Sequence, residues 1–274
     1  MNAYHVQVLT FALINVIMAT SLSLINGITG QFSIGHAGFM GIGAYTAGVL
    51  TVVYKLGFWP ALAAGSLAAA LAGLLVGLPT LRLRGDYLAI ATLGFGQIIN
   101  VAIINIPITG GPRGLTGVPA HTTLPLALAG AAMTYVILHN IIHSAHGRAM
   151  LAVREDETAA EAMGVDTTRV KVTAFTIGAG LAGLAGGLFA HRLMFLHPSS
   201  FDFIKSIDFL VMVVIGGSGN LAGAAGAAVF LTVLNELLRK AVELRMLLYA
   251  GLLILTMLLR PKGLFAGGVR RGRA

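Results

Sequence analysis

Apolar stretches long enough to cross a lipid bilayer follow one another along almost the whole chain, with short polar gaps between them. A spanning helix needs roughly 20 mostly apolar residues, so these stretches predict an all-α integral membrane protein with about nine (8–10) transmembrane helices. We expect one permease-like domain over residues 1–274. The spans are expected near residues 4–25, 34–54, 60–79, 86–106, 124–142, 172–192, 206–219, 222–238 and 246–260.

The composition excludes a soluble domain and argues against several kinds of function. Hydrophobic residues make up 57% of the chain and charged residues 10%, whereas soluble domains carry about 25% charged residues. The net charge of +8 does not indicate nucleic-acid binding, because the Lys and Arg residues lie in the gaps between spans. The chain has no cysteine, which excludes disulfides, thiolate metal sites and a Cys nucleophile.

The Lys and Arg residues also predict an orientation. With the N-terminus outside, 11 of the 18 fall in inside gaps and 7 in outside gaps, in agreement with the positive-inside rule. Arg239, Lys240 and Arg245 oppose this orientation, and a shift of one span would move them inside. The first residues lack a basic region and a cleavage site, so we expect a retained first span. Residues 143–171 and the C-terminal Arg cluster are predicted to be cytoplasmic.

Small residues are frequent, with 36 Gly among 274 residues. In a membrane, small residues let helix backbones approach closely. Spacing of four residues therefore predicts tight packing for two stripes. One is on the sixth span (Ala179, Gly183, Gly187) and the other on the third (Ala64, Ala68, Ala72).

The seventh span is short and ends in a Gly-rich run, residues 216–220, which predicts a broken or re-entrant helix. The same region matches an earlier one. Ser33 with Ala37, Gly38 and Gly41 recurs, at the same spacing, as Ser218, Ala222, Gly223 and Gly226. Two related halves would suit a transporter, and chance in a chain rich in Gly and Ala is the alternative.

Residues 143–171 form the long hydrophilic stretch of the sequence, and four of the ten acidic residues lie in 155–161. Residues 154–163 suit one short helix, with Gly164 as its C-terminal cap and Asp166 as the N-cap of the next span. The alternative is a solvated connector. An apolar side on such a helix indicates a protein partner, and we expect that side to comprise Ala159, Ala160, Ala162 and Met163.

This stretch resembles the EAA-type loop of permeases in ATP-binding cassette (ABC) importers. The whole chain, from about residue 8 to 266, resembles the M-type permease of branched-chain amino acid importers. One feature departs from that family, whose members usually have a further apolar helix before the segment that begins here. The resemblance rests on residues 30–37 (GQFSIGHA), 41–45 (GIGAY), 85–87 (GDY), 109–111 (TGG), 114–117 (GLTG), 154–164 and 260–264 (RPKGL).

The resemblance implies a multi-pass protein of the bacterial inner membrane that imports branched-chain or similar hydrophobic amino acids. Its partners would be an H-type permease, two cytoplasmic ATPases that bind ATP-Mg, and a periplasmic binding protein. Permeases of this kind also carry urea, short amides or sugars, so the substrate stays open. The resemblance assigns ATPase coupling to Arg154, Glu155, Asp156, Glu157, Ala160, Glu161, Gly164 and Val165.

No catalytic residue is predicted. The chain lacks the GxxxxGK[ST] loop that cradles phosphates, so ATP hydrolysis is expected in partner chains and no cofactor in this one. The rival class, a self-sufficient secondary transporter or channel, needs coupling-ion ligands or a proton relay near the midplane. The predicted spans contain no mid-span cluster of carboxylates, which argues against that class.

Polar residues inside the spans are the candidates for a translocation pathway, with helix packing as the alternative role. His139, His143 and His146 share one helical face, as metal ligands can. Polar tips are common at span ends, so no metal site is predicted. The pathway candidates are Asn26, Gln31, Ser33, His36, Gln97 and Asn100.

Overall fold

The computed structural model describes residues 3–80, 85–238 and 251, and every structural statement below refers to these residues. The regular structure among these residues is helical apart from one short strand pair, in which Leu115 lies opposite Leu196. The α-helices are α1 (Ala3–Leu22), α2 (His36–Val52), α3 (Phe58–Thr80), α4 (Asp86–Asn105), α5 (Leu124–His143), α6 (Ala145–Glu155), α7 (Glu157–Ala162), α8 (Thr167–Leu193), α9 (Phe203–Gly216) and α10 (Leu221–Leu237). The other elements are η1 (Ser23–Ile28), η2 (Pro107–Thr109), η3 (Gly111–Arg113), η4 (Pro198–Phe201), β1 (Leu115–Thr116) and β2 (Phe195–Leu196).

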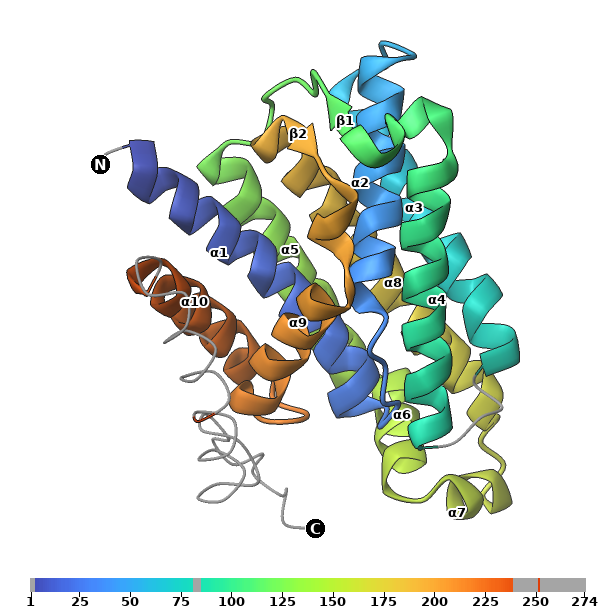
Figure 1. Cartoon of the computed structure of the whole chain (residues 1–274). Coiled ribbons are helices and arrows are strands. Elements are labelled where there is room, and N and C mark those ends of the chain that lie inside the picture. Colours follow the sequence, from blue (N-terminus) through green and yellow to red (C-terminus); the bar gives the residue numbers. More distant parts are fainter. Residues whose placement is uncertain (1–2, 81–84, 239–250, 252–274) are drawn as a thin grey trace.

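The long helices pack side by side, and their connections gather at two ends (Figure 1). The strands β1 and β2 lie at the end that we call the upper end, and α6 and α7 lie at the opposite, lower end. Five helices are long and apolar enough to cross a membrane: α1 with η1, α3, α4, α5 and α8. An all-α membrane protein is thereby confirmed, and the first eight predicted spans each coincide with a helix. The ninth, residues 246–260, lies outside the described residues except for residue 251.

The first span ends in a π-helix, and the chain then continues to α2 without regular structure. At the end of η1, the N–H of Thr29 donates to the carbonyl of Leu24, five residues earlier, at 3.1 Å. This spacing is that of a π-helix. Residues 29–35 are not helical, so α2 starts at His36 and not near residue 34. Non-helical backbone within a membrane needs protein partners for its polar groups. The N–H of Ile34 finds the Thr92 hydroxyl at 3.0 Å, and that of Ala37 finds the Ser206 hydroxyl at 3.1 Å.

The tightest packing joins α2, α3 and α8 through glycine. A Cβ added to Gly43 would lie 2.2 Å from the Gly183 carbonyl oxygen, and one on Gly65 would lie 2.6 Å from the Gly43 carbonyl oxygen. A Cβ on Gly186 would lie 2.0 Å from the Met40 carbonyl oxygen. These distances are too short for any side chain, so the backbones touch directly. The small-residue stripe predicted on the sixth span is confirmed.

The stripe predicted on the third span lies one residue away from the true contact. Ala64, Ala68 and Ala72 are only partly buried. One step along a helix turns the side chain by about 100°, and the next residue in each case is buried. The residues that face α2 and α8 are Gly65, Ala69 and Gly73.

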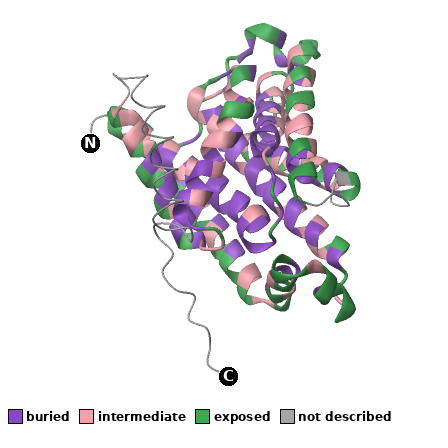
Figure 2. Ribbon diagram, turned by 60° about the horizontal axis from the view of Figure 1, so that its bottom comes forward, coloured by how far each residue is buried: buried purple, intermediate pink, exposed green. Residues whose placement is uncertain are grey.

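Figure 2 shows that buried residues gather in the middle of the bundle, while exposed residues cover its outer helices and its lower end. The apolar windows of α4 and α5 are each only 22% buried, and that of α3 is 33% buried. Large apolar side chains such as Leu75 and Ile90 therefore point away from the bundle. That is the expected arrangement for helices whose outer faces meet lipid or another membrane subunit.

The helices α9 and α10 form a hairpin whose turn lies at the lower end (Figure 1). With 14 residues, α9 is shorter than the roughly 20 residues that a full span needs. The turn has positive φ at Gly217 and Gly219, and the Asn220 side chain caps α10 by accepting the Gly223 N–H at 3.1 Å. Ser33 and Ser218 each stand three residues before a 17-residue helix. This correspondence supports the predicted repeat.

Candidate functional site

The segment 143–171 folds as two short helices, where the sequence predicts one helix over 154–163. The break falls at Asp156, whose backbone is extended with φ −156°. Its Oδ1 accepts the N–H groups of Thr158 at 2.9 Å and Ala159 at 3.0 Å. Asp is a strong N-cap because its carboxylate satisfies free N–H groups at a helix start. It therefore ends α6 and starts α7, which corrects the single helix.

Both predicted caps at the end of this segment are confirmed. Gly164 has φ +84°. The N–H of Val165 bonds the Ala160 carbonyl at 3.0 Å, and that of Gly164 bonds the Glu161 carbonyl at 2.9 Å. This pair of bonds is the Schellman motif, which needs a left-handed residue after the helix. Asp166 then accepts the Arg169 N–H at 2.9 Å and starts α8.

One side of α7 is fixed to the bundle. Ala160 is buried, with 6% of its surface exposed. Glu157, one turn earlier on the same face, forms an ion pair with Lys171 of α8, whose side chain is 8% exposed. The prediction that Ala160 lies on the exposed apolar side is therefore wrong. Because α7 restarts at Glu157, the helical period turns residues 157 and 160 inward together.

The opposite side of α7 is exposed. Ala159 and Ala162 are exposed, and Met163, which follows the helix, is 84% exposed. We call these three residues the outer face of α7. Glu161 is also exposed, and the Glu155 side chain is 75% exposed. An exposed methionine beside two exposed alanines, on a helix anchored from behind, is a compact apolar surface for a partner.

The Arg154 guanidinium reaches toward the bundle, while 35% of the side chain stays exposed. The sequence groups this residue with those for ATPase coupling. Its Nη1 donates to the Gly27 carbonyl at 2.7 Å, and its Nη2 lies 3.3 Å from the Glu155 carboxylate. Its neighbours include Gly30 and Gly219, from loops far apart in sequence. Sequence reasoning missed these glycines as parts of the site. The available signal was that both belong to the two Gly-rich segments at the start of α2 and α10.

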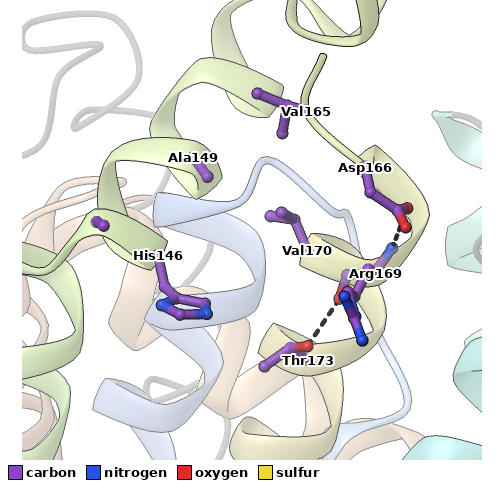
Figure 3. Close-up of a pocket in the computed structure, with 8 residues that line it drawn as sticks. His146, Ala149, Val165, Asp166, Arg169, Val170 and Thr173 are labelled. Atoms are coloured by element: carbon purple, nitrogen blue, oxygen red, sulfur yellow. Dashed lines mark hydrogen bonds between the residues drawn. The ribbon is translucent and has the colours of Figure 1, made fainter.

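A cleft of about 440 Å³ lies beside α7, between α6 and the start of α8 (Figure 3). His146 contributes an imidazole and Arg169 a guanidinium to the lining. Asp166 contributes a carboxylate that also caps α8. The Thr173 hydroxyl donates to the Arg169 carbonyl at 2.7 Å. Val165, predicted as a coupling residue, lines this cleft. The cleft lies at the lower end and not within the bundle, so it is no translocation pathway. The remaining lining residues are Ala145, Ala149 and Val170.

Four of the six pathway candidates lie in the segment that links α1 to α2. Asn26 holds the loop by accepting the Ser33 N–H at 3.2 Å and donating to the Ser33 carbonyl at 3.3 Å. His36 is fully buried, and its Nε2 lies 2.8 Å from the Ser21 hydroxyl. Several buried polar atoms of this segment have no partner among the described residues. They are Oγ of Ser23 and Ser33, Nδ1 of His36, and both amide atoms of Gln31.

The other two candidates, both on α4, do not join this segment. Gln97 is exposed on the outside of the helix. Asn100 donates from Nδ2 to the Pro198 carbonyl at 3.2 Å and so ties α4 to η4. The structure therefore favours a packing role for Asn100 and leaves Gln97 facing the surroundings of the chain.

The histidines on α5 and α6 make local contacts. The rings of His139 and His143 lie 4.2 Å apart, and His143 Nδ1 lies 2.7 Å from the His139 carbonyl oxygen. Across the residues that the structure describes, no three His, Cys, Asp or Glu side chains are placed to hold a metal ion.

Comparison with known proteins agrees with this geometry. The family described as branched-chain amino acid transport system / permease component matches residues 4–257. The high-affinity branched-chain amino acid transport system permease protein LivM of Salmonella typhimurium is 39% identical, over 94% of this chain and 69% of its own length. Its counterpart LivH, from the same organism, is 32% identical over 45% of this chain and 41% of its own length.

A third relative is named for a different transport system. The autoinducer 2 import system permease protein LsrC of Enterobacter sp. is 32% identical over 65% of this chain and 54% of its own length. No solved structure matches the chain. The family and the apolar helices confirm the predicted resemblance and the location in a bacterial inner membrane. The chain belongs to the family of branched-chain amino acid transport system permease components.

Proposed function

We propose that this chain is the membrane subunit of an ABC importer that moves branched-chain or similar hydrophobic amino acids into the cell by alternating access. ATP is hydrolysed by separate subunits and not by this chain. The observation that carries the proposal is the arrangement of α7. Its outer face is exposed, and its opposite side is anchored to the bundle by Ala160 and Glu157. A force transmitted to α7 from a partner reaches α8 directly through the pair of Glu157 with Lys171.

The assembly that we propose has a second permease of the H type, two cytoplasmic ATPases and a periplasmic binding protein. The similarity of this chain to both LivM and LivH supports a permease core built from two related chains. Within it, residues 1–274 form one transmembrane domain of about nine helices, and residues 143–171 are its cytoplasmic coupling loop.

We propose that the exposed residues of α7 meet the ATPase. Ala159, Ala162 and Met163 form the contact, with Glu155 and Glu161 at its rim. The remaining predicted residues shape or hold the loop. Asp156 and Gly164 cap α7, Glu157 and Ala160 anchor it, Val165 borders the cleft, and Arg154 binds the bundle.

We place the substrate pathway near the segment of Asn26, Gln31, Ser33 and His36, where buried polar atoms lack partners. Leaving such atoms unpaired costs stability, and sites that bind a passing ligand are where proteins bear that cost. LsrC is named for autoinducer 2 import, so a non-amino-acid substrate such as urea, a short amide or a sugar is the alternative. A secondary transporter is disfavoured, because the acidic residues of the described spans do not gather: Asp86 and Glu236 lie at the ends of their helices, and Asp208, within α9, lies 3.8 Å from the Lys205 ammonium.

The test targets the outer face of α7. Met163→Glu places a charge on the most exposed apolar residue of that face, and an unpaired charge at a packed interface is costly. The variant should reach the membrane, lose the ATPase during purification in mild detergent, and stop ATP-driven uptake in proteoliposomes. Ala152→Glu is the matched control, because Ala152 is exposed on α6 and the same charge there should have no effect.

Two results would contradict the proposal. If Met163→Glu retains the ATPase and transports at the wild-type rate, the docking assignment is wrong. If the purified chain accumulates amino acid in response to a Na⁺ or proton gradient with no ATPase present, the secondary-transporter alternative is correct.

A further inference from the structure

The side chain of Arg154 occupies a passage between two loops that glycines keep open. A Cβ on Gly30 would lie 2.8 Å from the Arg154 Cγ, and a Cβ on Gly219 would lie 2.7 Å from its Nη1. Both glycines have positive φ, at +74° and +92°. The loop of Gly219 also touches η1, since a Cβ on Gly27 would lie 2.5 Å from the Gly219 nitrogen. Arg154 thus contacts both loops beside the end of η1.

Arg154 donates a hydrogen bond to the C-terminal end of a helix. Gly27 lies in η1, and the carbonyl groups in the last turn of a helix lack partners within it. The Arg154 Nη1 donates to the Gly27 carbonyl at 2.7 Å, and its positive charge lies at the negative end of the helix dipole. A guanidinium has its donors in a fixed fork, so one Arg154 side chain bonds the Gly27 carbonyl while it pairs with the Glu155 carboxylate.

The two loops that Arg154 joins control equivalent parts of the bundle. Residues 29–35 precede α2, and residues 217–220 precede α10. Both helices have 17 residues, and both starts lie in the segments that share the repeated Ser, Ala and Gly spacing. A displacement of the Arg154 guanidinium therefore reaches the starts of two helices together.

Arg154 also stands next to the coupling helix. It lies two residues before Asp156, the break at which α7 begins, and its Nη2 pairs with Glu155. The inner anchor of α7, Glu157 with Lys171, holds the far side of the same break. Any movement of α7 relative to α6 must therefore act on the backbone that carries Arg154.

We propose that Arg154 is a positioning residue that passes movement of α7 to the loops before α2 and α10, and so couples ATP hydrolysis to opening of the bundle. This inference rests on the proposed function, since it requires an ATPase bound to α7. It differs from docking, because the Arg154 side chain faces the bundle and not the outer face of α7.

The test measures coupling in the complete transporter, reconstituted in liposomes with its ATPases, the second permease and the binding protein. ATP hydrolysis and branched-chain amino acid uptake are followed in the same preparation. Arg154→Gln should retain the ATPases and hydrolyse ATP at a rate within about twofold of wild type. Uptake should fall at least tenfold, so that the ATP used per amino acid rises by the same factor. Arg154→Lys, which keeps one charged donor, should lie between the two.

A second pair of variants leaves Arg154 in place and closes its passage. Gly219→Ala puts a methyl group 2.7 Å from Nη1, too close for the side chain to stay where it is, and should also uncouple hydrolysis from uptake. Gly117→Ala is the control, because Gly117 has φ +80° at the upper end and nothing within 4 Å of an added Cβ. It carries the same backbone strain without meeting Arg154, and its coupling ratio should match wild type. This pair decides the question if Arg154→Gln does not fold.

The outcomes separate the two proposals. A wild-type complex that shows no ATP-driven uptake overturns the proposed function, and the role of Arg154 with it. A working wild type with an unchanged ratio of ATP to amino acid in Arg154→Gln and Gly219→Ala overturns the role of Arg154 alone. Loss of the ATPases from Arg154→Gln also overturns it, because Arg154 would then be a docking residue.

Discussion

Glycine does different work in two regions of this bundle. Where α2, α3 and α8 cross, Gly43, Gly65 and Gly186 remove side chains so that backbones touch, with hypothetical Cβ atoms 2.0 to 2.6 Å from carbonyl oxygens. At the lower end, Gly30 and Gly219 have positive φ and surround the Arg154 side chain. In the first region glycine allows helix backbones to touch. In the second it allows a positive φ and leaves room for the Arg154 side chain.

The difference indicates which parts can move relative to each other. Helices in backbone contact cannot slide without collision, because packed interfaces deform in discrete steps and not continuously. We infer that α2, α3 and α8 move as one unit. The lower end is joined by turns, caps and single hydrogen bonds, which rearrange at lower cost, so it is the place for a joint. The predictions below test this contrast, beginning with the largest expected effect.

Gly186→Ala should be the most damaging of the single-methyl changes considered. Its Cβ would lie 2.0 Å from the Met40 carbonyl oxygen and 2.8 Å from the Ala44 nitrogen. Overpacking a well-filled core costs about 1–3 kcal/mol. Because the obstacle here is backbone, we expect the highest value of that range, about 3 kcal/mol. The measurement is the thermal unfolding midpoint in detergent. Gly226→Ala is the control, because nothing lies within 4 Å of its Cβ, and its midpoint should match wild type.

The ion pair that anchors α7 should show an asymmetric cost. Glu157→Gln removes the carboxylate charge that faces the buried Lys171 and should destabilise by about 2–3 kcal/mol, somewhat less than for a fully buried pair because Glu157 is partly exposed. Lys171→Met removes the ammonium charge that faces the more exposed Glu157 and should cost less. The double variant should recover most of the loss. Equal effects of the two single variants in thermal unfolding would show that burial does not set the energy of this pair.

Gln31→Met should stabilise the chain and impair transport. Gln31 is 4% exposed, and neither of its amide atoms has a partner among the described residues. Removing such unpaired groups should raise the free energy of unfolding by about 1–2 kcal/mol. If the segment lines the pathway, uptake should fall while ATPase binding persists. Gln97→Ala, at an exposed residue of α4, is the control and should leave both unchanged. A stabilised variant with full uptake would remove Gln31 from the pathway.

How far the sequence predicted this fold depended on the length of each pattern. The spans were predictable because apolar stretches of about 20 residues have few other solutions. The caps at Gly164 and Asp166 were predictable because each follows from one residue type. The stripe on α3 was missed by one residue, since Ala64 and Gly65 are both small and only tertiary contact decides between them.

Within the candidate site, the errors had one physical source. A hydrophilic loop gives no periodic signal for its inner side, so Ala160 was predicted on the exposed apolar side although it is buried. The inward contacts of Arg154 and Glu157 were not predicted for the same reason. The break at Asp156 shifted the helical phase of α7 and turned Ala160 inward. Lys171 could not be foreseen as the partner of Glu157, because their pairing depends on how α7 folds back against α8.

Gly164→Ala should have the smallest effect, and a local one. Nothing lies within 4 Å of a Cβ at Gly164, so the cost comes only from φ +84°, about 1 kcal/mol for a residue with a side chain. The Schellman bonds should weaken, and the Val165 amide should exchange its hydrogen roughly five times faster. Gly164→Asn, which tolerates positive φ better, should lie close to wild type.

Comparing Gly164→Ala with Gly186→Ala tests whether the coupling loop is separate from the packed helices. In α8 one methyl group should lower the unfolding midpoint of the whole bundle, whereas at Gly164 the midpoint should stay unchanged while exchange rises only in α7. ATPase affinity should change by much less than the exchange rate, because a partner binds the folded fraction of α7, and that fraction stays near one as long as opening is rare. Hydrogen exchange by mass spectrometry and thermal unfolding on the same samples check this. If Gly164→Ala lowers the global midpoint as Gly186→Ala does, the coupling loop is not a separate joint, and the division between the two regions is wrong.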